Sequence, residues 1–409
     1  MKCRHCGAEA RLQLVDLGSA PPSNALLTAD ALAGPEAWWP LRVLVCEICW
    51  LAQTEDFVRA DELFGSDYAY FSAFSTEWLA HAERYVGDMI ARFALNADSH
   101  VVEVAANDGY LLQYVKARGI PCTGIEPTTS TAAAARERGI DVIEAFFGVQ
   151  LAEEMARDGR QADLMAANNV LAHVPDINDF VRGFAILLKP DGVATFEFHH
   201  LQRLVDGCQF DTIYHEHFSY LSLTAVQRIF GVAGLAIFDV EELPTHGGSL
   251  RVFAQRADTD RRPRSPSVDA LLAAEDAAGM RSAGYYAGFQ ERILKIKYDF
   301  LSFLLSARTQ EKTVAGYGAA AKGNTLMNFA GIRPDLVPFV ADRNPAKQGK
   351  FLPGSRIPIV GAEELRRARP DFVIIFPWNL RDEVMAEHAY IAEWGGRFVT
   401  AVPELTITP

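Results

Sequence analysis

Apolar runs alternate with amphipathic stretches through the middle of the chain. Each short apolar run predicts a buried strand, and each following stretch, with apolar residues three and four positions apart, predicts a helix packed on it. Strands that alternate with helices in this way indicate a doubly wound α/β sheet. The expected strands span 100–104, 122–126, 141–147, 162–167, 193–198, 237–241 and 250–254, and the expected helices span 77–93 and 177–188, with another starting at Leu111.

A second α/β unit is expected near the C-terminus. An exposed connection rich in Arg, Asp and Pro (256–268) leads into a helical pattern over 267–307, with a break expected near Gly279. The following strands are expected from Lys312, at 337–342 and at 372–376.

The chain is too long for one ordinary hydrophobic core, so several domains are expected. The first is a small N-terminal lobe (1–62), and the second is the first α/β domain (63–255). The third combines a helical connection with a second, Rossmann-like α/β domain (256–409).

The N-terminal lobe carries two Cys-x-x-Cys pairs. Cys3 and Cys6 form the first pair, and Cys46 and Cys49 form the second. In a reducing compartment, two such pairs predict a tetrahedral thiolate zinc site rather than disulfides. Four thiolates leave no open coordination position, so the Zn²⁺ ion is expected to be structural.

Composition and charge narrow the classes of function. Hydrophobic residues make up 49% of the chain and charged residues 22%, as in soluble globular proteins. The formal net charge of −13 argues against nucleic acid or an anionic membrane surface as the main partner. No segment is long and apolar enough to span a bilayer, and the first residues lack the apolar core of a signal peptide, so a cytoplasmic protein is expected. The oligomeric state is left open.

Side chains capable of catalysis are most concentrated in residues 210–220. Tyr214, His215, Glu216 and His217 follow an apolar run there. Because histidine titrates near neutrality, such a cluster can move a proton at cellular pH. The His-x-His spacing also suits a metal, since both rings would face one side of a strand. An aromatic strand with structural histidines is the alternative, and the segment by itself favours neither.

The first expected strand of the α/β domain ends in a polar turn. The strand contains Glu103 and runs into Ala105, Asn107 and Gly109. A tight turn before a helix brings backbone amides close to a ligand, although Ala105 and Asn107 stand where a dinucleotide fingerprint has glycines. The next strand ends in Glu126, at the position that usually grips a ribose diol.

These motifs resemble the core of class I S-adenosylmethionine-dependent methyltransferases. The resemblance rests on Glu103-x-Ala105-x-Asn107-Asp108-Gly109, on Glu126, and on Asn168-Asn169 with His173. The full order of motifs resembles the bacterial sugar C-methyltransferases that act on dTDP-4-keto-deoxysugars. That order comprises the cysteine pairs, the methyltransferase core, Tyr214-His215-Glu216-His217, His246-Gly247-Gly248-Ser249 and Gly316-Tyr317-Gly318 with Lys322.

The resemblance implies an S-adenosylmethionine-dependent methyltransferase with a structural zinc ion and a dTDP-keto-deoxysugar substrate. A ketone at C4 of the sugar would make the C3 proton removable as an enolate, which then attacks the methyl sulfonium. The resemblance assigns the base to His217, with Tyr214 and Glu216 orienting it or the sugar. His173 is the other catalytic candidate, and His215 is expected to be structural.

The expected ligand contacts follow from the same resemblance. The C-terminal domain would hold the nucleotide of the sugar. The expected donor contacts are Tyr70, Glu103, Ala105, Asn107, Gly109, Glu126, Pro127, Phe146, Asn168 and Asn169. The expected substrate contacts are Asn24, Tyr68, His246, Gly247, Ser249, Tyr317, Lys322, Asp342, Trp378 and Asn379.

Other functions fit parts of the pattern. The C-terminal glycine turn suits a nicotinamide dinucleotide, which leaves open a sole dehydrogenase or a second, 4-ketoreductase activity. However, the turn lacks a third glycine and no Tyr-x-x-x-Lys pair follows it. O- or N-methylation of another small molecule would also need a general base. A zinc-ribbon scaffold or nucleic-acid binder with decayed enzyme domains is opposed by the acidic charge and the intact Tyr-His-Glu-His cluster.

Overall fold

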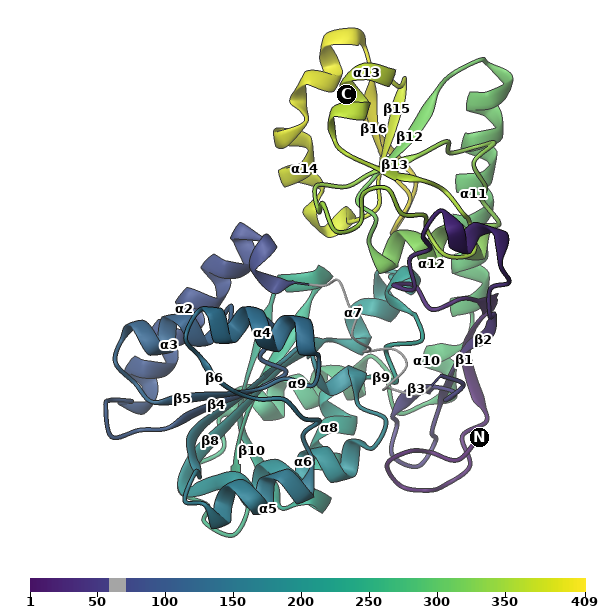
Figure 1. Ribbon diagram of the computed structural model, residues 1–409. Helices are drawn as coiled ribbons and strands as arrows, with labels where there is room; N and C mark the ends of the chain where they lie inside the picture. The colour runs from purple at the N-terminus through teal and green to yellow at the C-terminus, as the bar shows by residue number, and fades with distance from the viewer. Residues whose placement is uncertain (59–70) are drawn as a thin grey trace.

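The computed structural model of the chain describes residues 1–58 and 71–409. Figure 1 shows a central α/β body in blue and teal, an N-terminal lobe in purple beside it, and a C-terminal α/β body in green and yellow. Tyr68 and Tyr70, which were expected near the ligands, lie outside the described residues. Among the described helices, none combines the length and the apolar character needed to cross a bilayer.

The central sheet is the α/β sheet that the alternating pattern predicts. Its described strands are β4 (Val101–Val104), β5 (Cys122–Ile125), β6 (Asp141–Ile143), β7 (Ala162–Asn168), β8 (Leu188–His199), β10 (Leu235–Leu243) and β11 (Ser249–Arg256). These seven strands lie in the order β10-β11-β8-β7-β4-β5-β6. The pairs from β8 to β6 are parallel, whereas β11 pairs antiparallel with both β8 and β10. Parallel strands bring their carboxyl ends to one edge, where ligands bind in open α/β sheets.

Helices cover both faces of this sheet, because neighbouring residues of a strand point to opposite faces. Val101 packs in one core and Val102 in the other. The first face carries α2 (Thr76–Phe93), α3 (Leu112–Ala117) and α4 (Thr129–Glu137). The second carries α5 (Val149–Arg157), α6 (Ile177–Leu187), α8 (Leu223–Ala233) and α9 (Pro266–Ala277). The α/β fold of class I methyltransferase type is thus confirmed.

The N-terminal lobe is built on a sheet that it shares with the middle of the chain. Its own strands are β1 (Leu12–Ala20), β2 (Trp39–Val45) and β3 (Ala52–Thr54), with a short 3-10 helix η1 (Asp30–Ala33). A fourth described strand, β9 (Ser219–Tyr220), pairs antiparallel with β3, so that Ala52 lies opposite Tyr220. The segment that follows the Tyr-His-Glu-His cluster is therefore hydrogen-bonded to the lobe.

The C-terminal body holds the second sheet. Its described strands are β12 (Val314–Tyr317), β13 (Val340–Ala341), β14 (Ile359–Val360), β15 (Phe372–Ile375), β16 (Arg397–Thr400) and β17 (Thr406–Thr408), in the order β14-β13-β12-β15-β16-β17. All pairs are parallel except that of β16 with β17. The helices are α10 (Ala283–Tyr286), α11 (Phe289–Thr309), α12 (Ala321–Ala330), α13 (Glu363–Ala368), α14 (Arg381–Glu387), η6 (Trp378–Leu380) and η7 (Ala389–Trp394). The expected break near Gly279 is confirmed, since α9 ends at Ala277.

Three expectations about strands are wrong. The strand expected at 337–342 is confined to β13 (Val340–Ala341), since Pro338 has no N–H to donate to a neighbouring strand. The strand expected over 141–147 ends at Ile143, because β6 is the edge strand and Glu144 turns to bind Thr129 and Arg136. The cluster at 210–217 is not a strand either: it begins with the 3-10 helix η4 (Phe210–Thr212) and continues in a turn. The Thr212 hydroxyl donates to the Gln209 carbonyl at 2.7 Å, a local bond that competes with strand pairing.

One hydrophobic core joins the three parts of the molecule. It contains Val43 of the lobe, Phe210 of η4, Phe329 of α12 and Ile374 of β15. The N-terminal lobe is therefore packed into the molecule, against both α/β bodies.

Candidate active site

A cavity of about 1490 Å³ opens where the three parts meet. Its wall includes Asn24 of the lobe, the carboxyl edge of the central sheet, the η3 turn (Leu171–His173), the Tyr-His-Glu-His cluster and Lys322 of α12. Pockets for one small molecule usually measure roughly 300–1,000 Å³. The cavity is therefore large enough for two ligands side by side.

One end of the cavity lies beyond β4 and β5. Glu126 is 5% exposed, and its oxygens accept the backbone N–H groups of Asn107 and Thr128, each at 2.9 Å. Burial raises the pKa of this carboxyl, and the two backbone amides oppose that rise. Ala105 and Asn107 have φ of 60° and 49°, in the left-handed region that strains residues with a side chain. The turn thus follows the path that glycines usually provide, although neither residue is a glycine.

The residues at this end fit an adenosine group. Glu126 stands where a ribose diol is gripped, and Phe146, 54% exposed, offers a ring face for a base. Of the expected donor contacts, Glu103 and Gly109 do not line the cavity, and Glu103 is fully buried. Those that line it are Ala105, Asn107, Glu126, Pro127, Phe146, Asn168 and Asn169.

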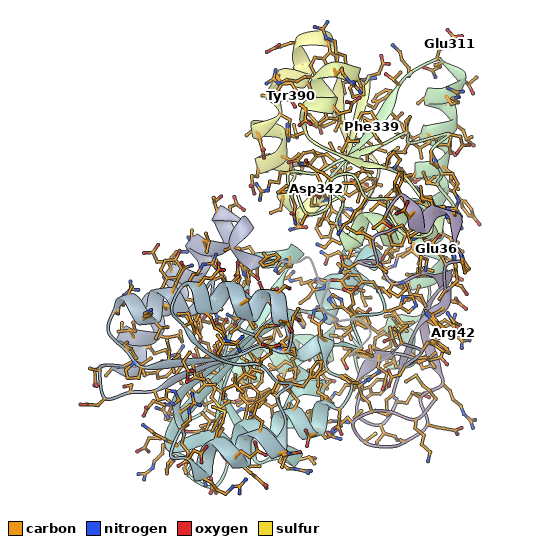
Figure 2. All side chains as sticks on the ribbon, viewed as in Figure 1. Glu36, Arg42, Glu311, Phe339, Asp342 and Tyr390 are labelled. Carbon is orange, nitrogen blue, oxygen red and sulfur yellow. The ribbon has the colours of Figure 1, made fainter. Side chains whose placement is uncertain are left out.

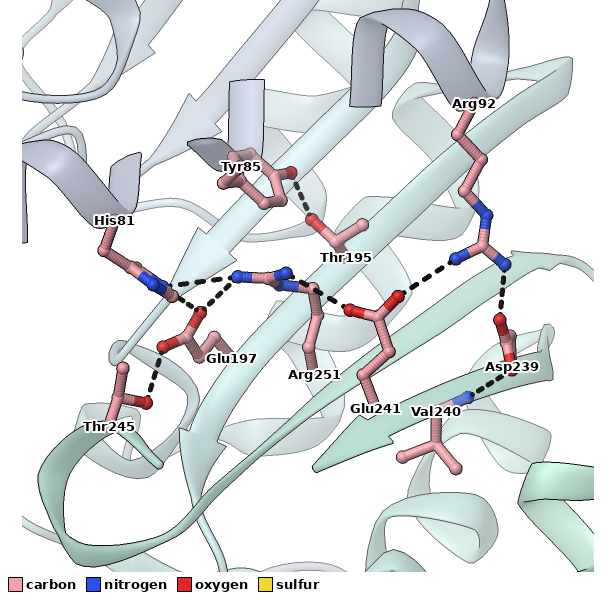
Figure 3. Close-up of polar contacts among 10 residues, drawn as sticks. All are labelled: His81, Tyr85, Arg92, Thr195, Glu197, Asp239, Val240, Glu241, Thr245 and Arg251. Atoms are coloured by element: carbon pink, nitrogen blue, oxygen red, sulfur yellow. Dashed lines mark hydrogen bonds and ion pairs between the residues drawn. The ribbon is translucent and has the colours of Figure 1, made fainter. Parts of the chain in front are cut away.

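A chain of polar contacts ties α2 to the sheet beside the cavity (Figure 3). The buried carboxylate of Glu197 accepts hydrogen bonds from His81 at 2.9 Å, Arg251 at 2.9 Å and the Thr245 hydroxyl at 3.0 Å. Arg251 also binds Glu241 at 3.2 Å. Burial raises the pKa of Glu197, but His81 and Arg251 outweigh it and hold that pKa below its usual value. An ionised, fully partnered Glu197 therefore fixes both α2 and the Thr245 turn.

Aromatic rings form the wall above this network, and of these the sequence singled out only His246. Trp78 of α2 stacks on His81 at 4.8 Å and on Tyr110 at 5.9 Å, and it lies 5.3 Å from His246. All four rings line the cavity. The signal that could have found them is the spacing of Trp78 and His81, because residues three apart share one face of a helix.

The catalytic candidates converge on the cavity. The His217 ring lies 4.0 Å from the Tyr214 ring and 4.6 Å from the His173 ring, and these residues line the cavity with Glu216. His215 points away, toward the lobe, where its Nε2 lies 3.3 Å and 3.2 Å from two backbone carbonyl oxygens of β2. The two histidines of His-x-His therefore diverge and do not form a joint metal site.

The His217 ring is held in one tautomer. Its Nδ1 lies 2.8 Å from the carbonyl oxygen of Thr212. A carbonyl can only accept, so Nδ1 carries the proton and Nε2 keeps its lone pair. Burial lowers the pKa of His217 well below its usual value, and the neighbouring His173 lowers it further. The imidazole is therefore neutral at cellular pH, with Nε2 available to accept a proton.

Lys322 brings a cation to the C-terminal side of the cavity. Its Nζ donates to Asn379 at 2.8 Å and lies 4.5 Å from the centre of the Trp378 ring. Trp378 donates its indole N–H to the buried Asp211 at 2.7 Å. Burial lowers the pKa of Lys322 to about 8, and the charge of Asp211 opposes this. A desolvated cation of this kind suits an anionic group such as a phosphate.

The expected substrate contacts divide into two groups. Asn24, His246, Lys322 and Asn379 line the cavity. The others do not line it. The Ser249 hydroxyl donates to a backbone carbonyl at 3.0 Å, and Asp342, labelled in Figure 2, accepts two backbone N–H groups. The residues of this second group are Gly247, Ser249, Tyr317, Asp342 and Trp378.

The four cysteines of the lobe come together as their spacing predicts. Their Sγ atoms all lie within 4.8 Å of one another, with Cys3 and Cys49 at 3.4 Å and Cys6 and Cys46 at 3.6 Å. Thiolates around one zinc ion, at roughly 2.3 Å each, adopt such spacing. None of the four lines the cavity, and the cluster fits a structural Zn²⁺ ion.

Comparison with known proteins agrees with this arrangement. Family models match a zinc binding domain at residues 3–64, a methyltransferase domain at 78–240 and a C-methyltransferase C-terminal domain at 244–403. The chain is 36% identical over 403 residues to the C-methyltransferase NovU of Streptomyces niveus, covering 98% of this chain and 96% of that protein.

Solved structures resemble parts of the chain. The PH0226 protein of Pyrococcus horikoshii OT3 is 15% identical with a TM-score of 0.39, covering 46% of this chain and 95% of that one. Magnesium protoporphyrin IX methyltransferase of Synechocystis PCC 6803, solved with SAH, is 15% identical with a TM-score of 0.34, covering 44% and 82%.

Proposed function

Because the chain belongs to the C-methyltransferase family, we propose that it methylates C3 of a dTDP-4-keto-deoxysugar through an enolate formed by His217. S-adenosylmethionine, when bound near Glu126, supplies the electrophilic methyl group. The four cysteines hold the structural zinc ion. The sugar, the carbon and the base are the parts of this proposal that go beyond the family.

The observation that carries the proposal is the state of the His217 ring. Its Nδ1–H is committed to the Thr212 carbonyl, so Nε2 is the atom that can take a proton. The ring lies in the same cavity as the donor end at Glu126 and the cation at Lys322. A base between a methyl donor and an anion-binding group is what carbon methylation of a sugar nucleotide requires.

The proposed reaction begins with loss of the proton at C3. His217 Nε2 takes the proton from C3, and the electron pair of the C–H bond moves toward the C4 oxygen. The enolate pair would then form the C3–CH₃ bond as the C4 carbonyl is restored, and the pair of the broken S–CH₃ bond would stay on the sulfur. The proton stays on the imidazole. Negative charge develops on the C4 oxygen, where hydrogen-bond donors stabilise it. Tyr214 and His173, whose rings lie beside His217, are the residues we assign to that oxygen or to its orientation.

We assign the nucleotide of the substrate to the C-terminal side of the cavity. Lys322 is the proposed partner of the diphosphate, since its half-buried side chain lines the cavity and burial lowers its pKa. Asn379 holds the Lys322 ammonium at 2.8 Å, and we assign it to the same subsite. A substrate bound there extends its sugar toward His217 across the shared cavity.

A nicotinamide-dependent second activity gains no support from the C-terminal turn. Gly318 has φ of +86°, and a Cβ built on it would lie 2.5 Å from Pro377. The glycine therefore makes room for a proline side chain rather than for a pyrophosphate. We leave a ketoreductase activity out of the proposal.

The test is hydrogen exchange at C3 of a dTDP-4-keto-2,6-dideoxyhexose in deuterium oxide, followed by proton NMR. We expect exchange without the methyl donor and a new methyl singlet when S-adenosylmethionine is added. His217→Asn should slow exchange by about 10²–10⁴-fold, the range for loss of a general base. His215→Asn is the matched control, because the Nε2 of that ring faces two backbone carbonyls of the lobe. Exchange at the wild-type rate in His217→Asn would remove His217 as the base.

A further inference from the structure

We propose that the zinc lobe supplies a positioning residue to the active site: Asn24 holds the carboxylate of Glu216 beside His217. This role rests on the proposed function, together with the sequence-based expectation that Glu216 orients the base or the sugar. It gives the lobe a task beyond folding, because the lobe then completes the catalytic cavity.

The contact is short and crosses two parts of the molecule. Asn24 Nδ2 donates to Glu216 Oε2 at 2.5 Å. Glu216 is 2% exposed, whereas Asn24 is exposed in the cavity wall. A buried carboxylate needs hydrogen-bond donors to stay ionised, and here a donor comes from a loop of the lobe. The pair therefore sits at the boundary between buried protein and the space for substrate.

The loop that carries Asn24 is fixed from behind. Ser23 is 4% exposed and its hydroxyl lies 3.4 Å from the Thr325 hydroxyl of α12. Thr325 donates in turn to the Ile213 carbonyl at 2.9 Å, three residues before Glu216. The lobe, α12 and the catalytic segment thus meet at one buried point, which sets where Asn24 can reach.

A second anchor holds the same loop farther along. Glu36 accepts from Arg356 at 2.9 Å and from the Gly354 N–H at 2.7 Å, and Leu27 pairs with Phe351 through backbone hydrogen bonds. Figure 2 labels Glu36 where the N-terminal segment lies against the C-terminal body, and Figure 1 shows that segment beside α12. This anchor lies outside the cavity wall. It is therefore a means to loosen the loop without touching Glu216.

Electrostatics make the contact measurable. Burial raises the pKa of Glu216 to about 7, and the Asn24 amide works in the opposite direction. The titratable groups around Glu216 in the cavity include Tyr214 and His217 of the same segment. From other elements come His173 of η3, His199 of β8, Tyr220 of β9 and Lys322 of α12. Removing the Asn24 donor leaves Glu216 protonated to a higher pH.

The experiment compares the pH dependence of C3–H exchange in zinc-loaded, full-length wild type, Asn24→Ala, Asn24→Asp and Glu36→Gln. In Asn24→Ala the midpoint of the acid limb, the low-pH side of the pH–rate profile, should rise by about one pH unit, as expected for a lost charge-assisted bond. The exchange rate should then recover above pH 9. Asn24→Asp adds a like charge and should move the limb farther. Glu36→Gln loosens the loop that carries Asn24 from outside the cavity, so its acid limb should move in the same direction as that of Asn24→Ala, by a smaller amount. An Asn24→Ala profile with the wild-type midpoint would overturn the positioning role.

A second measurement separates this role from the proposed function. Asn24→Ala should lower the unfolding temperature more at pH 8.5 than at pH 5.5, because the amide bond is stronger to an ionised carboxylate. Equal losses at the two pH values would refute the pairing even if no substrate were found. If the wild type exchanges no C3 proton but the thermal difference appears, the proposed function fails while the Asn24–Glu216 contact stands.

Discussion

Replacing Lys322 with methionine should strengthen the fold and weaken ligand binding at the same time. Burial lowers the pKa of Lys322 from 10.5 to about 8. A fall of this size corresponds to roughly 3 kcal/mol, at most, against the charged form in the folded state. Since the folded pKa lies below the unfolded one, the penalty is fully present below pH 8 and fades as the pH rises toward 10.5.

The net change in the free energy of unfolding is smaller than this penalty. Lys322→Met also removes the hydrogen bond to Asn379 and the contact with the Trp378 ring. Those interactions contribute about 1–2 kcal/mol together. We therefore expect the ligand-free variant to be more stable by about 1–2 kcal/mol at pH 7, measured by urea unfolding.

The binding measurement is calorimetric titration with dTDP. Loss of a buried cation at a diphosphate should weaken affinity by about 10–100-fold, since charge-assisted bonds contribute about 1.5–3 kcal/mol. Wild-type affinity should fall by up to about tenfold between pH 7 and pH 9, as the lysine loses its proton near pH 8. Lys322→Arg should bind with little dependence on pH, because arginine stays charged.

Lys312→Met is the matched control. Lys312 pairs with Asp371 at 2.9 Å, and its side chain is 48% exposed. A surface pair of this kind contributes about 0–1 kcal/mol, so both stability and dTDP binding should stay near wild type. Wild-type dTDP affinity in Lys322→Met, or a loss of stability in that variant, would refute the assignment.

Other features of the site give further predictions. Glu197→Gln leaves Arg251 buried beside a neutral amide, and urea unfolding should show a loss of about 3–5 kcal/mol. Gly247→Ala places a Cβ 2.5 Å from the Trp378 ring at φ of +91°, so we expect C3–H exchange to fall at least about tenfold together with the unfolding temperature. Cys49→Ala, or zinc removal by a chelator, should abolish exchange along with zinc content, because the lobe's sheet holds β9.

The sequence predicted the central sheet because its strands are short apolar runs followed by helical spacing. The carboxyl ends of those strands then located Glu126 and Asn168, since an open sheet gathers strand ends at one edge. The zinc cluster could also be predicted, because two Cys-x-x-Cys pairs in a reducing compartment have few functions other than metal binding.

The catalytic segment was harder to predict because distant residues decide its shape. His215 turns away through two carbonyls of β2, at 39 and 40 in the chain. The Trp378–Asp211 bond spans a sequence separation of 167 residues, and His81 meets Glu197 across 116. Such contacts leave no local pattern, so neither propensity nor spacing could reveal them.

The pairing of β3 with β9 sets the limits for exchanging parts between related enzymes. The lobe's sheet is completed by Ser219 and Tyr220, which come from within the methyltransferase segment of the chain. A chimera that imports only the N-terminal residues would present a foreign edge to β9 and a foreign loop to Glu216. A transferable unit must therefore combine the lobe with the segment from η4 to β9, two stretches of chain that are distant in sequence but paired in one sheet.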